Sequence, residues 1–99
     1  MKHYRHGDLL IVEVSSIPSE AEHMDQHNRV LAYGEVTGHK HQLDLGDMFE
    51  TKDGKLYFKL PENGKLSHEE HNTIVLPPGK YEVRRQREYS PEMVRPVAD

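Results

Sequence analysis

Two short segments of the chain concentrate residue types that bind metal ions. The first contains His39 and His41, and the second contains His68, Glu70 and His71. Imidazole and carboxylate groups together suit a divalent first-row metal with open coordination positions. The spacing therefore predicts one metal site built from His39, His41 and His68, with Glu70 or His71 as the fourth ligand. Zinc, manganese, iron and nickel all fit such a ligand set, so the pattern leaves the identity of the metal open.

The periodicity of β-strands explains why these groups would meet. Residues two apart on a strand share a face, so His39 and His41 lie on the apolar face of their segment with Leu43. The same period places His68 and Glu70 on the apolar face of the second segment. Polar groups on a buried face must be paired, and a shared metal ion would satisfy both segments. The alternative interpretation is that His39 and His68 are hydrogen-bonded core residues and that the other polar groups are solvated.

The remaining histidines carry weaker patterns. His3 and His6 fall in an N-terminal segment that we expect to be mobile or at a sheet edge. His23 and His27 are four apart, a spacing that places two residues on one face of a helix. The glutamate of the HExxH motif is absent between them, so the spacing gives little support for a metal site.

The only basic concentration in this acidic chain lies at residues 80–89. On a strand, Arg85 and Arg87 share a face with Tyr81, where they could clamp the carboxylate or phosphate of a small anionic substrate. The alternative function is a non-catalytic adaptor that docks a protein or a nucleic acid through this strand. A third interpretation is structural, with arginine stems covering apolar surface.

Turn signals and alternation predict the elements that would hold these residues. Asp53-Gly54 and Asn63-Gly64 are typical of tight hairpins, and Pro77-Pro78-Gly79 predicts a third turn. Short alternating or β-branched runs predict strands at 8–14, 29–36, 39–45, 55–60, 73–76 and 81–89. The pattern indicates an all-β fold, a single small antiparallel β-barrel or sandwich of cupin-like or SH3-like size over residues 1–99. A capping-box pattern adds at most one short helix near 19–27.

The amino-acid composition excludes some classes of function and disfavours others. Only 34% of the 99 residues are hydrophobic, so the core is thin, and a metal, a ligand or a homo-oligomer interface is expected to add stability. The absence of cysteine excludes disulfides, cysteine-ligated zinc and thiol nucleophiles. The net charge of −4 disfavours nucleic acid as a partner. No apolar run approaches the roughly 20 residues of a membrane span, so we expect no membrane contact and a cytoplasmic location.

Several motifs of nucleotide-binding proteins and hydrolases are missing from the sequence. The chain has no P-loop, no GxGxxG and no GxSxG, so whether it is an enzyme stays open.

Protonating all 8 histidines would change the formal charge from −4 to +4. The chain could therefore be a pH-responsive module whose histidine cluster charges below about pH 6.5.

Longer stretches carry a resemblance. GEVTGHKHQL at 34–43 and LSHEEHNTIVLPPGKYEVRRQREYSPE at 66–92 resemble a group of small uncharacterised bacterial and phage proteins, which open with a segment similar to RHGDLLIVEV at 5–14. A looser resemblance is to the cupins, whose first metal motif has a glycine, then HxH, then a glutamate. That resemblance implies a β-barrel metal site, with Asp44 near the glutamate position and His68 or His71 as the distant ligand. The chain departs from the cupin pattern because its Pro-Pro-Gly turn follows the candidate histidine.

Overall fold

Ten short strands and no helix make up the part of the chain that the computed structural model describes, residues 2–24, 29–33 and 39–85. Their alternating burial follows the expected period of two. The strands are β1 (His3–His6), β2 (Leu9–Val14), β3 (Glu22–Met24), β4 (Val30–Tyr33), β5 (Lys40–Leu43), β6 (Asp47–Glu50), β7 (Leu56–Leu60), β8 (Gly64–Ser67), β9 (Ile74–Leu76) and β10 (Gly79–Arg85). The prediction of an all-β antiparallel fold is confirmed.

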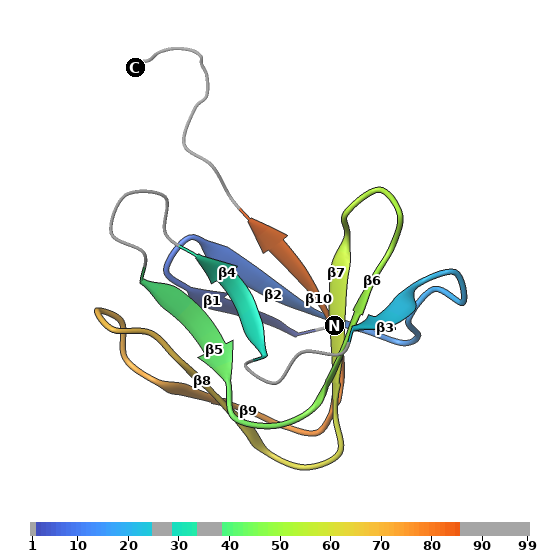
Figure 1. Cartoon of the computed structure of the whole chain (residues 1–99). Coiled ribbons are helices and arrows are strands. Elements are labelled where there is room, and N and C mark those ends of the chain that lie inside the picture. Colours follow the sequence, from blue (N-terminus) through green and yellow to red (C-terminus); the bar gives the residue numbers. More distant parts are fainter. Residues whose placement is uncertain (1, 25–28, 34–38, 86–99) are drawn as a thin grey trace.

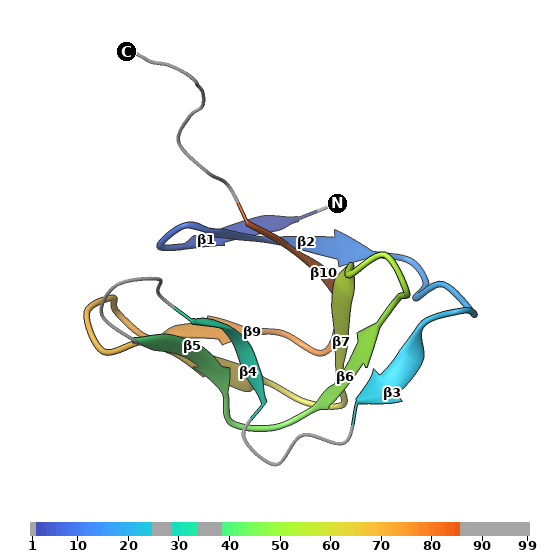
Figure 2. The same ribbon diagram turned by 45° about the horizontal axis from the view of Figure 1, so that its top comes forward.

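The strands form two antiparallel sheets. The six-stranded sheet has the order β1-β2-β10-β7-β6-β3, and the four-stranded sheet has the order β4-β5-β8-β9. Strands β1, β2 and β10 lie over the four-stranded sheet (Figure 2). Among the described residues no strand pairing joins the two sheets, so the arrangement is sandwich-like and does not close as a barrel. No helix of the described ranges could cross a membrane.

The core lies between the sheets. On β2, the side chains of Leu9 and Ile11 point into the core, because residues two apart on a strand share a face. Phe58 of β7 and Tyr81 of β10 stack with their ring centres 5.0 Å apart, and both are fully buried. The Tyr81 hydroxyl donates a hydrogen bond of 2.6 Å to the Pro77 carbonyl, which fixes the corner where the chain passes between the two sheets.

The two predicted glycine hairpins have different outcomes. Asp53-Gly54 joins the paired strands β6 and β7, and Gly54 has the positive φ of 90° that the turn requires. Asn63-Gly64 does not form a hairpin, because β7 and β8 belong to different sheets. A Cβ at Gly64 would lie 3.1 Å from the Leu60 side chain. The absence of a side chain at Gly64 therefore allows the start of β8 to pack closely against Leu60, where the chain passes from one sheet to the other.

The prediction of a short helix near 19–27 is wrong for residues 19–24, and residues 25–27 lie outside the described ranges. The segment contains β3, which pairs with β6 through the register Glu22↔Glu50. The segment is almost entirely polar, so a helix would have no apolar stripe to bury. As a strand it satisfies its backbone against the edge of β6. His23 Nε2 on β3 lies 3.4 Å from Oδ1 of Asp47. His27, which the helical spacing paired with His23, lies outside the described residues.

The topology brings three distant segments to one end of the molecule. The β1–β2 turn, the start of β5 and the loop between β8 and β9 lie together in both views (Figures 1 and 2). Contacts between the segments agree with this placement, since His6 binds the Asn72 carbonyl and lies against the ring of His41. Candidate chemistry in this chain is therefore concentrated at this end.

Candidate metal centre

Four histidines converge at this end, and we call them the inner cluster: His6, His41, His68 and His71. His6 ends β1, His41 lies on β5, and the other two lie in the β8–β9 loop. Every pair among them has ring centres between 4.5 and 6.3 Å apart. A ring bound through nitrogen at about 2.1 Å has its centre about 3.2 Å from the metal, so two ligand rings have centres up to about 6.4 Å apart. The four imidazoles therefore lie against one another in one compact cluster.

Local sequence explains how His6 and His41 become buried. On β1 the exposed His3 and Arg5 alternate with Tyr4 and His6, and His6 is only 2% exposed. His41 is also 2% exposed, and it shares its inward face of β5 with the buried Leu43. Both imidazoles therefore need partners inside the protein.

Gly7 makes room for the cluster. It has a φ of 64° in the two-residue turn between β1 and β2, where glycine at the first turn position is typical of a type II′ hairpin. A Cβ at this position would lie 2.6 Å from Nε2 of His71 and 3.1 Å from Cε1 of His41. The glycine thus permits both the turn and the close approach of the β8–β9 loop.

The hydrogen bonds of the buried pair fix the proton on one nitrogen of each ring. His6 Nε2 lies 2.9 Å from the Asn72 carbonyl oxygen, which can only accept, so this nitrogen carries a hydrogen. His41 Nε2 lies 3.2 Å from Oδ1 of the Asp8 carboxylate, which requires a hydrogen there as well. In the neutral rings both Nδ1 atoms are then unprotonated, and they face each other at 2.9 Å. Two such lone pairs repel each other at this distance, so the pair needs either a proton on one Nδ1 or a metal ion that both nitrogens bind.

A metal ion meets this requirement geometrically. Two nitrogen ligands at about 2.0–2.1 Å from one ion lie about 2.8–3.0 Å apart at octahedral angles and about 3.3–3.4 Å apart at tetrahedral angles. The separation of 2.9 Å between the two Nδ1 atoms matches the octahedral value. A metal-bound histidine usually donates its other nitrogen to a carboxylate or a carbonyl, and both rings do so here.

The surroundings of His6 and His41 disfavour an additional proton on either ring, which is the alternative to a metal ion. Burial above all, together with the neighbouring His68 and His6, lowers the pKa of His41 to about 4, against the opposing effect of Asp8. Burial also lowers the pKa of His6, with His71 and His68 acting in the same direction. Both rings are therefore neutral near pH 7, the form that binds a metal.

Asp8 links the cluster to β10. Burial works to raise the pKa of Asp8, but the hydrogen bond and the charge of Arg85 outweigh it, so the pKa lies below its usual value. Arg85 Nε donates to Asp8 Oδ2 at 2.9 Å, and the guanidinium also donates to the Tyr33 carbonyl. Arg85 thus holds the carboxylate that orients His41. Its predicted role as an anion clamp stays a prediction, as does the adaptor role of strand 80–89, and Arg87 lies outside the described residues.

A second set of ligands borders the inner cluster, and we call it the outer group: His39, His68 and Glu69. One ligand atom from each lies within 4.8 Å of the others. Glu70 contacts both histidines: its Oε2 lies 3.2 Å from His39 Nδ1, and its backbone amide donates to His68 Nδ1 at 3.0 Å and so occupies the lone pair of that nitrogen. Lys40 holds Glu69 through its backbone amide at 2.9 Å and its ammonium group at 3.4 Å.

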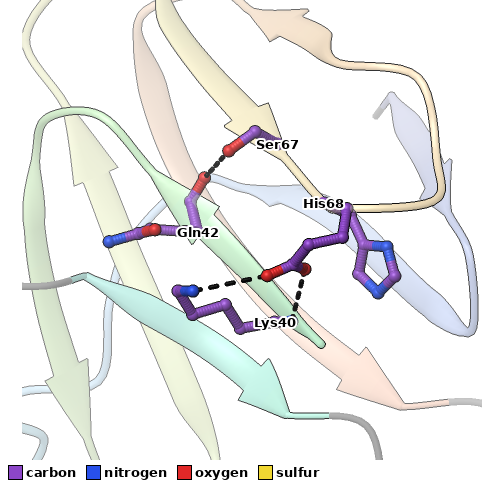
Figure 3. A pocket seen from close by; sticks show the side chains of 5 residues that line it. Lys40, Gln42, Ser67 and His68 are labelled. Atoms are coloured by element: carbon purple, nitrogen blue, oxygen red, sulfur yellow. Dashed lines mark hydrogen bonds and ion pairs between the residues drawn. The ribbon is translucent and has the colours of Figure 1, made fainter. Parts of the chain in front are cut away.

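Two members of the outer group, His68 and Glu69, line a pocket. Its volume is about 260 Å³, and it is lined by Lys40, Gln42, Ser67, His68 and Glu69. Figure 3 shows Lys40 reaching it from β5 and His68 from the end of β8. Hydrogen bonds from the Lys40 backbone amide, above all, lower the pKa of Glu69 to about 2. This carboxylate is therefore an anion at every pH at which the histidines can bind a metal.

The structure brings together most of the predicted ligands. His41, His68 and His71 meet in one cluster, whereas His39 lies at its border and contacts His68 with ring centres 5.7 Å apart. Glu70 lies beside His39, outside the inner cluster. Their role as metal ligands stays a prediction.

Three functional candidates were absent from the predicted set: His6, Asp8 and Glu69. The alternation along residues 3–6 and the Gly7-Asp8 turn signal could have identified the first two. The expectation of an edge segment was confirmed for β1, yet His6 is buried there because the four-stranded sheet covers its inner face. No local pattern distinguishes Glu69 from Glu70.

Comparison with known proteins places the chain in a family. Residues 5–86 match the model of a domain of unknown function, DUF8820. The chain belongs to this family. The matched range contains the whole inner cluster and the outer group of this DUF8820 domain. Searches of curated proteins and of solved structures gave no match.

The family match agrees with the predicted resemblance to an uncharacterised family, and it carries no cupin relationship. In the DUF8820 domain, Asp44 accepts a hydrogen bond of 2.8 Å from the Lys65 backbone amide and is exposed. The cupin-like pattern would have needed it near the metal.

Proposed function

We propose that this DUF8820 domain binds one divalent first-row transition metal in the inner cluster. The ligands are Nδ1 of His6, Nδ1 of His41 and a ring nitrogen from His68 or His71. The observation that carries the proposal is the pair of Nδ1 atoms that lie 2.9 Å apart, on two rings whose Nε2 atoms are each directed at an acceptor. Zinc and nickel fit an all-imidazole set, whereas magnesium and calcium prefer oxygen.

The ion would act first as a cross-link between the two sheets. His6 belongs to the six-stranded sheet and His41 to the four-stranded sheet, and the loop after β8 adds further ligands. With 34% hydrophobic residues the chain has a thin core, so metal binding would contribute a large share of the folding free energy. A set of three imidazoles also leaves a coordination position for water or a substrate.

The neighbours of the ligands support this assignment. Asn72 and Asp8 hold the outer nitrogens of His6 and His41, which fixes the orientation of each ring. The Asp8 carboxylate also places a negative charge next to the proposed ion. Such partners raise the basicity of imidazole ligands and favour binding.

Thermal unfolding of untagged, metal-free protein with and without Zn²⁺ or Ni²⁺ tests the proposal. We expect the metal to raise the Tm of the wild-type protein, and we expect a His6→Asn/His41→Gln variant to lose most of this rise. A His3→Asn/His23→Gln variant is the matched control, because both of these histidines are exposed and distant from the cluster. Equal metal-induced rises in the wild-type protein and the His6/His41 variant would contradict the proposal.

A further inference from the structure

We infer that the outer group, His39, His68 and Glu69, is a second divalent-metal site that faces solvent. The three ligand atoms lie within 4.8 Å of one another, and two of the residues, His68 and Glu69, line the pocket of about 260 Å³. This inference extends the proposed function of the inner cluster, but it rests on two ligands, His39 and Glu69, that the inner cluster does not contain.

The surroundings of the outer group orient its ligands. Glu70 Oε2 lies 3.2 Å from His39 Nδ1, and the Glu70 backbone amide donates to His68 Nδ1 at 3.0 Å. A metal that binds His68 through Nδ1 would therefore have to replace this amide. The Lys40 backbone amide holds Glu69 Oε1 at 2.9 Å, so the carboxylate is fixed by a main-chain group. Two imidazoles and one carboxylate are the ligand set of many sites that keep open positions for water.

The Lys40 ammonium group competes with a metal for Glu69. It lies 3.4 Å from Oε2, and both side chains are substantially exposed. A metal on Oε2 would displace this weak surface ion pair and would meet the positive charge of the lysine nearby. The outer site is therefore expected to bind more weakly than the buried inner cluster.

His68 belongs to both sets of ligands. Its ring centre lies 4.5 Å from those of His41 and His71 and 5.7 Å from that of His39. When His68 binds the outer metal, His6, His41 and His71 still provide three imidazoles for the inner one. Both sites can therefore be filled together.

Isothermal titration of the untagged, metal-free chain with Zn²⁺ tests the inference. We expect two equivalents in the wild-type protein, one tight and one weak. A His39→Gln/Glu69→Gln variant should lose the weak equivalent alone, and the His6→Asn/His41→Gln variant should lose the tight one alone. Circular dichroism of each metal-free variant verifies that the fold is kept. Because Glu69 is exposed and His39 is half-buried, whereas His6 and His41 are fully buried, the His39/Glu69 variant is the more secure test.

Lys40→Met provides a gain-of-affinity test of the same site. Removing the competing charge should strengthen the weak equivalent by about threefold, while Lys59→Met, at an exposed position on β7, should leave it unchanged. Saturation of the wild-type protein at one equivalent, or a weak equivalent that survives in the His39/Glu69 variant, would overturn the second site. Loss of no equivalent in the His6/His41 variant would instead overturn the inner site.

Discussion

The Nδ1 atoms of His6 and His41 face each other at 2.9 Å, although the two residues are 35 positions apart in the chain and belong to different sheets. Each ring directs its other nitrogen to an acceptor, the Asn72 carbonyl or the Asp8 carboxylate. The proton positions that these acceptors demand leave two lone pairs opposed in a buried place. A metal ion between them would resolve this arrangement and join the sheets.

Asp8 should set the affinity of the inner cluster. Asp8→Asn removes the negative charge next to His41 Nε2, so we expect Zn²⁺ affinity to fall by about 10- to 100-fold. Titration of the metal-free variant measures the change. Asp47→Asn is the matched control, because Asp47 faces the exposed His23 at 3.4 Å, far from the cluster. Equal affinities for the two variants would show that Asp8 does not support a metal ligand.

Gly7 should be intolerant of a side chain for two separable reasons. Gly7→Ala places a Cβ 2.6 Å from His71 Nε2 at a φ of 64°, whereas Gly54→Ala has a φ of 90° but no atom within 4 Å. The Gly54 variant should lose about 1 kcal/mol of stability from backbone strain, and the Gly7 variant about 2–3 kcal/mol. Urea unfolding measures both. Metal affinity should fall in the Gly7 variant only, and an equal loss of stability in both would contradict the steric explanation.

The metal-free protein should lose stability on mild acidification. The unfolded chain protonates His41 near its ordinary pKa of 6.5, whereas the folded protein resists until about pH 4. The unfolded state therefore binds more protons between these two values, and stability falls as the pH falls through that window. Across this window the protonation of His41 lowers the free energy of unfolding by on the order of 3 kcal/mol.

Comparison with His41→Gln isolates this contribution, since other groups also titrate in the window. Urea unfolding in the presence of EDTA, at several values between pH 7 and about 4, should show a shallower dependence for the variant. Parallel curves for the two proteins would indicate that His41 is not buried in its neutral form.

Much of the fold could be predicted from the sequence because it depends on short-range signals. Alternation identified most strands, and it correctly placed His41 on an inward face with Leu43. The Asp53-Gly54 hairpin followed from turn chemistry alone. The Asn63-Gly64 crossing could not be recognised, because which sheet receives β8 depends on how distant strands pair.

The site was predictable in part for the same reason. The spacing of the histidines in residues 39–41 and 68–71 is visible in the sequence. His6 joins these two segments only because β1 packs over the other sheet. The choice between Glu69 and Glu70 depends on the course of the loop after β8, where the period of a strand no longer applies. Loop geometry turns Glu69 toward Lys40 and Glu70 toward His39.

The Tyr81 hydroxyl should matter for stability and not for the metal. Tyr81→Phe removes the hydrogen bond of 2.6 Å to the Pro77 carbonyl, so we expect a loss of about 1 kcal/mol. Tyr33→Phe, at a residue that is 55% exposed, is the control and should be neutral. Thermal unfolding measures stability, and Zn²⁺ titration should give the same affinity for both variants. A change in affinity for Tyr81→Phe alone would show that this corner is coupled to the inner cluster.

Nitrogen NMR of the histidine rings distinguishes a metal site from a shared proton, because it reports the state of each ring nitrogen in the metal-free protein and after one equivalent of Zn²⁺. We predict that Nδ1 of His6 and Nδ1 of His41 change from unprotonated to metal-bound signals, while both Nε2 atoms stay protonated. Nδ1 signals that show a shared proton and do not respond to Zn²⁺ would contradict this prediction.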